Sequence, residues 1–545
     1  MLVLLAAVVA ATADPMPMHT HGDVPHVGRL AFESTCNSAA QARLVQGLEW
    51  LHSFEYARAE QQFSAAAADD SGCGLALWGV AMSYYHPLWA APTADELQKG
   101  MAAIKKARAV GARSEREKDY IGALETFYRG APAVDHKSRV LAYSEAMATL
   151  HRKYPADNQA ALLYALSLIA VGTLVHDPSF MREKEAGAII NQVLAVEPDN
   201  PGVWHYMIHS FDYPALAQLA LPAARRYAAV APDSAHAQHM PSHIFTRLGL
   251  WDESIKSNVA AEAAAIEYEH SSGMAGAWDQ QLHAMDYLAY AFLQTGRDSE
   301  LNALVNRLNH IHQADPPSPT TAYAVTAIPA RAVLERRRWS DAAKLDLPAS
   351  LKNLDALAKH KWAMGNIHFA RAVGAARSGD VSATQTEISE LAALEQSLAI
   401  PPGEYDWRKQ IEIQRQIAEG WLARAEHRDA DAERIMRAAA DLDDATEKHP
   451  VTPGAILPAR EQLGELLLDL KRPSDALKEY EASLARSPAR LGGVYGAARS
   501  AQSARRQLDA HRFYAQLVEM TKQGDQALAE VKEARDYLAQ AASAH

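Results

Sequence analysis

Histidine is the residue type in this sequence best placed to do chemistry, because two of its pairs share one spacing. His205 and His209 are four residues apart, and His239 and His243 repeat that pair 34 residues further along the chain. Residues four apart lie on one face of a helix, so each pair presents two imidazoles on the same side. Neutral imidazole is a common ligand of transition metals. The spacing therefore predicts a metal site between neighbouring helices.

Three further side chains fall into register with these pairs. His236 precedes His239 by three residues, and the alignment of Gly296 with Gly249 places His283 and Asp286 at the two corresponding positions. Asp212, Asp286 and Tyr206 are also close enough in sequence to orient imidazole rings. The predicted metal ligands are His205, His209, His236, His239, His243, His283 and Asp286.

The helices that carry these residues are predicted by a repeat of 34 residues. Tyr480 recurs as Tyr514, and Pro198 recurs as Pro232. Small residues accompany each aromatic where two helices of a hairpin would approach closely, and alanine is abundant throughout, which favours helix. This pattern resembles the tetratricopeptide repeat family, whose units are pairs of helices.

The resemblance implies an all-α fold, a curled α-solenoid of helical hairpins in two segments, with the paired histidines lining a concave groove. Residues 85–160 and 315–450 keep the pattern poorly, so helices are expected there without a fixed register. The segment 239–249 (HMPSHIFTRLG) is also similar to a motif of exported bacterial members of the family. That similarity marks the region as functional and names no reaction.

Pro241 interrupts the helix expected to carry His239 and His243. Proline is tolerated in the first turn of a helix and breaks its interior. The sequence therefore predicts a helix that begins near Pro241, with His236 and His239 on the loop that enters it.

Four segments are predicted along the chain. Residues 1–13 are apolar and end in an A-x-A pattern, which is typical of a signal peptide. Residues 14–35 are rich in Met, His and Pro, and are either a copper-handling segment or a disordered N-terminus. Residues 36–315 form an array with the histidine-lined groove, and residues 316–545 form a second array. The predicted location is periplasmic or extracellular.

Composition excludes several classes of function. With 54 basic and 66 acidic residues the net charge is −12, and no basic patch indicates nucleic-acid binding. No stretch after residue 13 is long and apolar enough to span a bilayer. The motifs of serine hydrolases, nucleotide-binding loops and zincin proteases are absent from the sequence.

Only two cysteines are present, Cys36 and Cys73. In an exported protein they form either a disulfide or two separate buried thiols. Two cysteines cannot build a thiolate-rich metal site, so a metal would depend on histidine and carboxylate ligands.

These observations leave three functional hypotheses. The first is a transition-metal site, with copper or zinc as the ion, in which an open coordination position would allow catalysis. The second is a scaffold for protein–protein interaction, in which a peptide or partner protein occupies the groove and the histidines contact it. The third is a binder that responds to pH through its histidines.

Overall fold

The computed structural model describes residues 25–88, 91–175, 177–399 and 404–543. The predicted signal peptide and residues 14–24, the first half of the Met/His-rich segment, therefore lie outside the described residues. Apart from one two-residue parallel pair, β1 (Ala277–Trp278) with β2 (Ala314–Asp315), the regular structure in these ranges is helical. The predicted all-α fold is confirmed.

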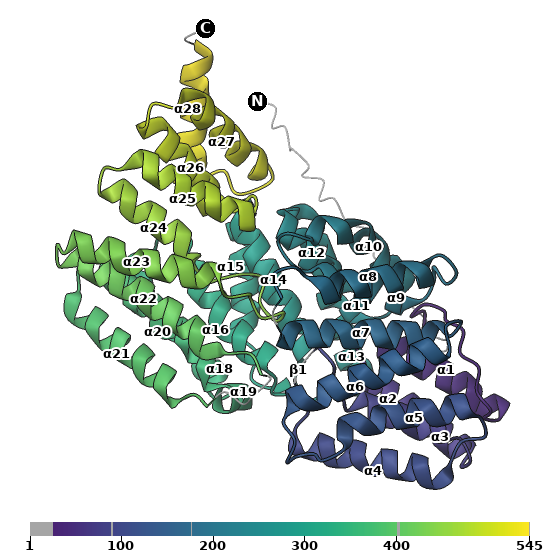
Figure 1. Cartoon of the computed structure of the whole chain (residues 1–545). Coiled ribbons are helices and arrows are strands. Elements are labelled where there is room, and N and C mark those ends of the chain that lie inside the picture. Colours follow the sequence, from purple (N-terminus) through teal and green to yellow (C-terminus); the bar gives the residue numbers. More distant parts are fainter. Residues whose placement is uncertain (1–24, 89–90, 176, 400–403, 544–545) are drawn as a thin grey trace, which may run out of the picture.

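The first part of the chain is a succession of helical hairpins that leads to the centre of the molecule (Figure 1). Its helices are α1 (Ser38–His52), α2 (Tyr56–Asp69), α3 (Gly74–Ser83), α4 (Ala94–Val110), α5 (Glu115–Tyr128), α6 (His136–Lys153), α7 (Asn158–Leu174), α8 (Met181–Leu194), α9 (Pro201–Phe211), α10 (Ala217–Val230), α11 (Ala235–His239), α12 (Pro241–Leu248), α13 (Trp251–Ser272), α14 (Asp279–Thr295) and α15 (Asp298–Asn309).

The second part continues the array from the centre to the C-terminus (Figure 1). Its elements are α16 (Pro319–Leu334), α17 (Trp339–Ala342), α18 (Ala349–Lys352), α19 (Asp355–Lys359), the 3₁₀ helix η1 (Lys361–Met364), α20 (Gly365–Arg377), α21 (Val381–Ser397), α22 (Trp407–Ala425), α23 (Asp429–Asp444), α24 (Ala459–Asp469), α25 (Pro473–Arg486), α26 (Leu491–Ser503), α27 (Gln507–Met520) and α28 (Ala529–Ser543). Helices thus fill both stretches in which the repeat register was not fixed.

Small residues allow each hairpin to close around an aromatic ring. The ring of Phe63 in α2 lies between Gly47 of α1 and Gly79 of α3, where an added Cβ would come within 2.6 and 2.3 Å of it. The ring of Tyr480 in α25 packs against Gly496 of α26 in the same way, and a Cβ added to Gly496 would come within 2.2 Å of that ring. Because any larger side chain would push the helices apart, these positions explain the repeat of small and aromatic residues. The array of hairpins confirms the resemblance to tetratricopeptide repeat proteins.

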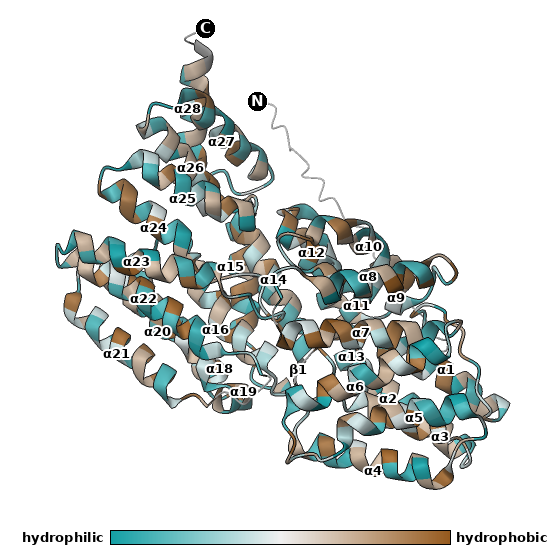
Figure 2. Ribbon diagram, in the orientation of Figure 1, coloured by the Kyte–Doolittle hydropathy of each residue, from teal (hydrophilic) through white to brown (hydrophobic). Residues whose placement is uncertain are grey.

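Most helices carry one apolar and one polar face, and the apolar faces meet between neighbouring hairpins (Figure 2). The helix α7 is an exception, because most of its residues are buried on all sides. None of the described helices is long and apolar enough to cross a membrane.

The chain around Pro241 differs in part from its prediction. Pro241 is the first residue of α12, as proline's tolerance of a first turn requires. His236 and His239 do not lie on a loop, because residues 235–239 form the short helix α11, which Ser234 caps through its side chain. The interruption is confined to Met240, whose backbone stays helical (φ −54°, ψ −35°).

The two parts of the array contact each other directly across the centre of the molecule. Trp251 of α13 donates its indole N–H to the carbonyl of Ala489 at 2.7 Å. Arg490 donates to the hydroxyl of Tyr290 at 2.7 Å, and its guanidinium is almost fully buried. These contacts hold the C-terminal hairpins against α13 and α14, close to the predicted histidine region.

At the other end of the chain, Cys36 and Cys73 form a disulfide. It ties the segment before α1 to the residue that precedes α3. Of the two alternatives that the sequence left open, the structure has the disulfide.

Candidate metal centre

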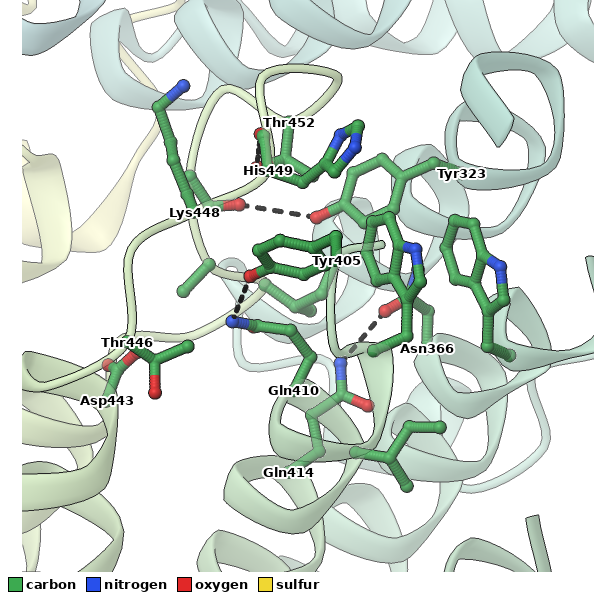
Figure 3. A pocket seen from close by; sticks show the side chains of 16 residues that line it. Tyr323, Asn366, Tyr405, Gln410, Gln414, Asp443, Thr446, Lys448, His449 and Thr452 are labelled. Atoms are coloured by element: carbon green, nitrogen blue, oxygen red, sulfur yellow. Dashed lines mark hydrogen bonds between the residues drawn. The ribbon is translucent and has the colours of Figure 1, made fainter. Parts of the chain in front are cut away.

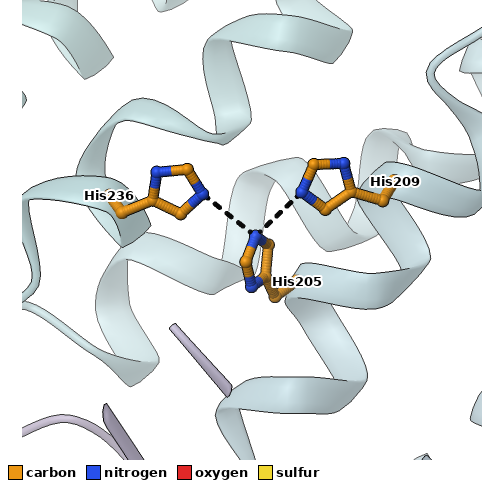
Figure 4. Close-up of side chains that lie close together, drawn as sticks. All are labelled: His205, His209 and His236. Atoms are coloured by element: carbon orange, nitrogen blue, oxygen red, sulfur yellow. Dashed lines mark hydrogen bonds between the residues drawn. The ribbon is translucent and has the colours of Figure 1, made fainter. Parts of the chain in front are cut away.

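The structure brings six of the seven predicted ligands together as two groups of three. The first triad is His205 and His209 of α9 with His236 of α11 (Figure 4). The second triad is His239 of α11, His243 of α12 and His283 of α14. Within each triad, one nitrogen from every imidazole lies within 4.8 Å of the others.

The nitrogens that face one another are mainly the Nε2 atoms. In the first triad, Nε2 of His205 lies 3.1 Å from Nε2 of His209 and 3.2 Å from Nε2 of His236. In the second triad, the Nε2 atoms of His239 and His243 are 3.0 Å apart. The ring of His283 lies over that of His239, with centroids 4.1 Å apart.

Oxygen atoms hold the opposite nitrogen of two imidazoles in the first triad. Nδ1 of His205 donates to the backbone carbonyl of His52 at 2.5 Å, and Nδ1 of His236 donates to the side-chain oxygen of Gln280 at 3.2 Å. Because these oxygens can only accept, the proton of each neutral ring sits on Nδ1. The Nε2 lone pairs then point into the triad.

The second triad is held in the same way. Nδ1 of His239 donates to Oδ1 of Asn258 at 2.7 Å, and the amide of Asn258 is oriented by its own bond to the carbonyl of Ser254 at 2.8 Å. Nδ1 of His243 donates to the carboxylate of Asp212 at 2.9 Å. Such oxygen partners on the outer nitrogen are typical of metal-bound histidines, whose tautomer and ring orientation they fix.

Burial keeps these imidazoles neutral. Removal from water lowers the pKa of His236 to about 3 and places the pKa values of His205 and His239 well below their ordinary value. The neighbouring imidazoles lower them further, since two positive rings so close together repel. Neutral rings with converging lone pairs repel one another unless a cation lies between them, so the arrangement suits a metal ion.

In each triad, one aromatic side chain contacts all three imidazole rings. The ring of Phe54, in the turn between α1 and α2, lies 4.3 Å from that of His205 by centroid and also contacts the other two rings of the first triad. Tyr287 of α14 lies 4.8 Å from His239 and contacts the other two rings of the second triad. The sequence pattern did not single out either aromatic, although Tyr287 follows His283 by one helical turn.

The histidines do not line an open groove, which corrects the prediction from the family resemblance. His205 is fully buried and His243 is 2% exposed, and of the six only His209 is partly accessible. The turn that carries Phe54 covers one side. Residues 446–458, from the second part of the array, lie against the residues that surround the second triad.

Several polar contacts attach this covering segment to residues that surround the second triad. Glu447 accepts from Arg247 at 2.5 Å, and the ammonium of Lys448 lies 3.7 Å from the carboxylate of Asp212. The hydroxyl of Tyr287 donates to the carbonyl of Thr452 at 3.2 Å. Sequence reasoning missed the segment, because no local pattern connects residues more than 150 positions apart.

The other predicted residues have different surroundings. Asp286 belongs to neither triad, and its Oδ1 accepts a hydrogen bond from the buried guanidinium of Arg331. Its role as a ligand stays a prediction. The hydroxyl of Tyr206 lies 2.7 Å from Nδ1 of His52, and its ring packs beside that of His205 with centroids 5.6 Å apart. Asp212, which was expected to orient an imidazole, contacts His243 directly.

A small, partly open pocket lies beside the covering segment (Figure 3). Its wall includes the stacked rings of Trp362 and Trp407, with centroids 3.5 Å apart, together with Tyr405 and His449. Lys448 and His449 belong to the covering segment, so this pocket and the histidine centre share one wall.

No family model matches the chain, and no curated protein matches it. Among solved structures it is similar to yeast Tom70, with 11% identity, a TM-score of 0.29 and coverage of 89% of this chain and 90% of that one. It is also similar to human IFIT1 bound to m7Gppp-AAAA, with 12% identity, a TM-score of 0.35 and coverage of 82% and 90%. The TPR domain of P58(IPK) is a third such structure, with 13% identity, a TM-score of 0.21 and coverage of 86% of this chain and 98% of that one. Likenesses this distant say nothing about the chemistry of the histidines.

Proposed function

We propose that this protein binds two transition-metal ions, one in each histidine triad, with copper or zinc as the metal. One observation carries the proposal: four of the six imidazoles have their Nδ1 held by an oxygen acceptor while their Nε2 points into a triad. A core histidine is satisfied by one hydrogen-bond partner at each ring nitrogen. Nε2 of His205 instead lies 3.1 and 3.2 Å from two further imidazole nitrogens, and Nε2 of His239 lies 3.0 Å from that of His243.

The ligand chemistry supports these two metals. Each triad offers neutral nitrogen donors and no thiolate, since Cys36 and Cys73 are joined to each other. Imidazole suits copper and zinc, whereas magnesium and calcium prefer oxygen. Three ligands leave a fourth position open, so zinc could activate a water molecule there and copper could exchange an electron.

An oxidising compartment is part of the proposal. The disulfide between Cys36 and Cys73 supports it, because such bonds persist in the periplasm and outside the cell and are rare in the cytosol. The apolar run at residues 1–13 with its A-x-A ending supports the same location.

The rival reading of the histidines as peptide contacts fits less well. A peptide that enters a groove from solvent needs accessible side chains, and five of the six histidines are buried. A partner protein would have to use another face of the array.

Metal analysis by mass spectrometry tests the proposal, with mature protein that carries no polyhistidine tag. We expect one equivalent of metal per triad in the parent protein. The double variant His209→Ala/His243→Ala removes one ligand from each triad and should lose both equivalents. His270→Ala is the matched control, because His270 lies exposed on α13 outside both triads.

A parent protein that retains no copper or zinc after reconstitution and dialysis would overturn the proposal. Circular dichroism of all three proteins shows whether a loss of metal reflects a lost ligand or a lost fold.

A further inference from the structure

We infer that the two triads form one dinuclear centre, in which a small anionic oxygen ligand such as hydroxide bridges the two metals. This inference rests on the proposed function and adds to it a ligand class and a coupling between the sites. Three observations support it. The two triads lie side by side, aromatic side chains pack against each triad, and neither triad contains a carboxylate to balance the charge of a metal ion.

The short helix α11 contributes to both triads. His236 belongs to the first and His239 to the second, and residues three apart are neighbours on a helix surface. Their ring centroids are 6.3 Å apart. One turn of helix therefore fixes the two triads side by side.

A second pair of histidines, one from each triad, also lies side by side. The rings of His209 and His243, from the two triads, have centroids 6.4 Å apart. These two pairs of adjacent rings place the triads side by side, as in two-metal sites, whose ions lie about 3.5–4 Å apart. A single bridging atom, or a ligand of two or three atoms, can span that distance.

The aromatic side chains occupy other sides of the triads. Phe54 contacts all three rings of the first triad, and Tyr287 contacts all three rings of the second. The ring contacts described between the two triads, in contrast, pair imidazole with imidazole. A metal held by each triad would then have its open position on the side that faces the other triad.

Charge decides the kind of ligand. Neither triad contains a carboxylate, so two divalent ions would bring four positive charges into a buried space with neutral ligands. The nearby carboxylate of Asp212 is already balanced by Arg247 and Lys448, and that of Asp286 by Arg331. An anion between the metals lowers their mutual repulsion, which neutral imidazoles cannot do.

Electron paramagnetic resonance of the full chain loaded with copper tests the inference. The protein is treated with ferricyanide so that all copper is Cu(II), and the bound copper is counted by metal analysis. We expect two copper ions per chain and loss of most of the resonance signal, because a bridging ligand couples the two unpaired electrons. Denaturation in acid should restore a signal that accounts for both ions.

Two controls separate coupling from other causes of a weak signal. His243→Ala removes a ligand from the second triad only, so its remaining copper should give the full signal of one isolated ion. Parent protein loaded with one copper and one zinc per chain provides the same test without a mutation, since zinc carries no unpaired electron. Azide, a small anion that can bridge two metals, should leave most of the resonance signal of the doubly loaded parent missing, whereas azide on the single copper of His243→Ala should leave the full signal of one ion.

Two bound copper ions that give the full signal of two independent ions would overturn the dinuclear centre while leaving metal binding intact. Binding of a single copper per chain would overturn it as well. Absence of any bound metal is a separate outcome, which removes the proposed function itself.

Discussion

The imidazole of His243 donates its Nδ1 proton to the carboxylate of Asp212 at 2.9 Å, across 31 residues of sequence. Asp212 accepts from Arg247 at 2.8 Å through its other oxygen, and Lys448 of the covering segment lies 3.7 Å away. One carboxylate thus orients a proposed ligand and also holds the segment that closes the site. The two functions can be separated by experiment.

Replacement of Asp212 by asparagine should weaken metal binding at the second triad by about 10- to 100-fold, the usual cost of losing a carboxylate behind a ligating histidine. Competition with a chelator of known affinity measures the change. The first triad has no contact with Asp212 among the bonds described, so its affinity is the internal control. Equal weakening at both triads would mean that the variant acts through the fold and not through His243.

The variant Asp286→Asn should keep both metal equivalents and lower the free energy of unfolding. Asp286 is paired with Arg331, whose guanidinium is fully buried, and a buried charge that loses its partner costs about 3–5 kcal/mol. Metal analysis and urea denaturation measure the two effects. Loss of one metal equivalent would instead establish Asp286 as a ligand, as the sequence predicted.

The carboxyl group of Asp443 should make stability depend on pH. Burial raises its pKa from 3.8 to about 6, so ionisation above that pH is costly in the folded state. In the folded protein the raised pKa favours the protonated form. The free energy of unfolding of the parent therefore decreases, through this group, as pH rises from about 4 to 6. Asp443→Asn should be more stable than the parent by about 3 kcal/mol above pH 6, with no advantage below pH 4.

Denaturation at several pH values measures this difference, and the exposed residue Asp341 provides the control variant Asp341→Asn. The asparagine oxygen can still accept the backbone N–H of Ala459, which lies 3.1 Å from the carboxylate. A difference that stays constant over this pH range would contradict the assignment to Asp443.

The double variant Cys36→Ser/Cys73→Ser should unfold more easily than the parent. The disulfide spans 37 residues, and closing a loop of that length stabilises a protein by about 4 kcal/mol through the entropy of the unfolded chain. Urea denaturation of the parent with and without a reducing agent provides a second measurement without mutation. An unchanged midpoint in both comparisons would show that the bond adds no stability.

Much of the fold and of the grouping of the histidines could be predicted from the sequence because both depend on local periodicity. The 34-residue repeat of small and aromatic residues predicted helical hairpins, and Phe63 between two glycines shows why that repeat exists. The four-residue spacing within α9 placed His205 and His209 on one face, and the repeat placed a second pair nearby. The four-residue spacing and the 34-residue repeat together predicted that all six histidines of the two triads lie near one another.

The tertiary structure decided how the histidines divide into triads and which distant residues bury them, which the sequence spacings do not determine. Backbone geometry around Pro241 let a short helix form, so that His236 and His239 joined different triads. Burial by Phe54 and by residues 446–458 depends on contacts between distant segments, which a repeat within the sequence cannot encode. The same is true of Asp286, whose nearest charged partner, Arg331, lies 45 residues away on another helix. Local spacing determines which face of a helix a residue occupies, whereas the packing of whole helices determines what that face meets.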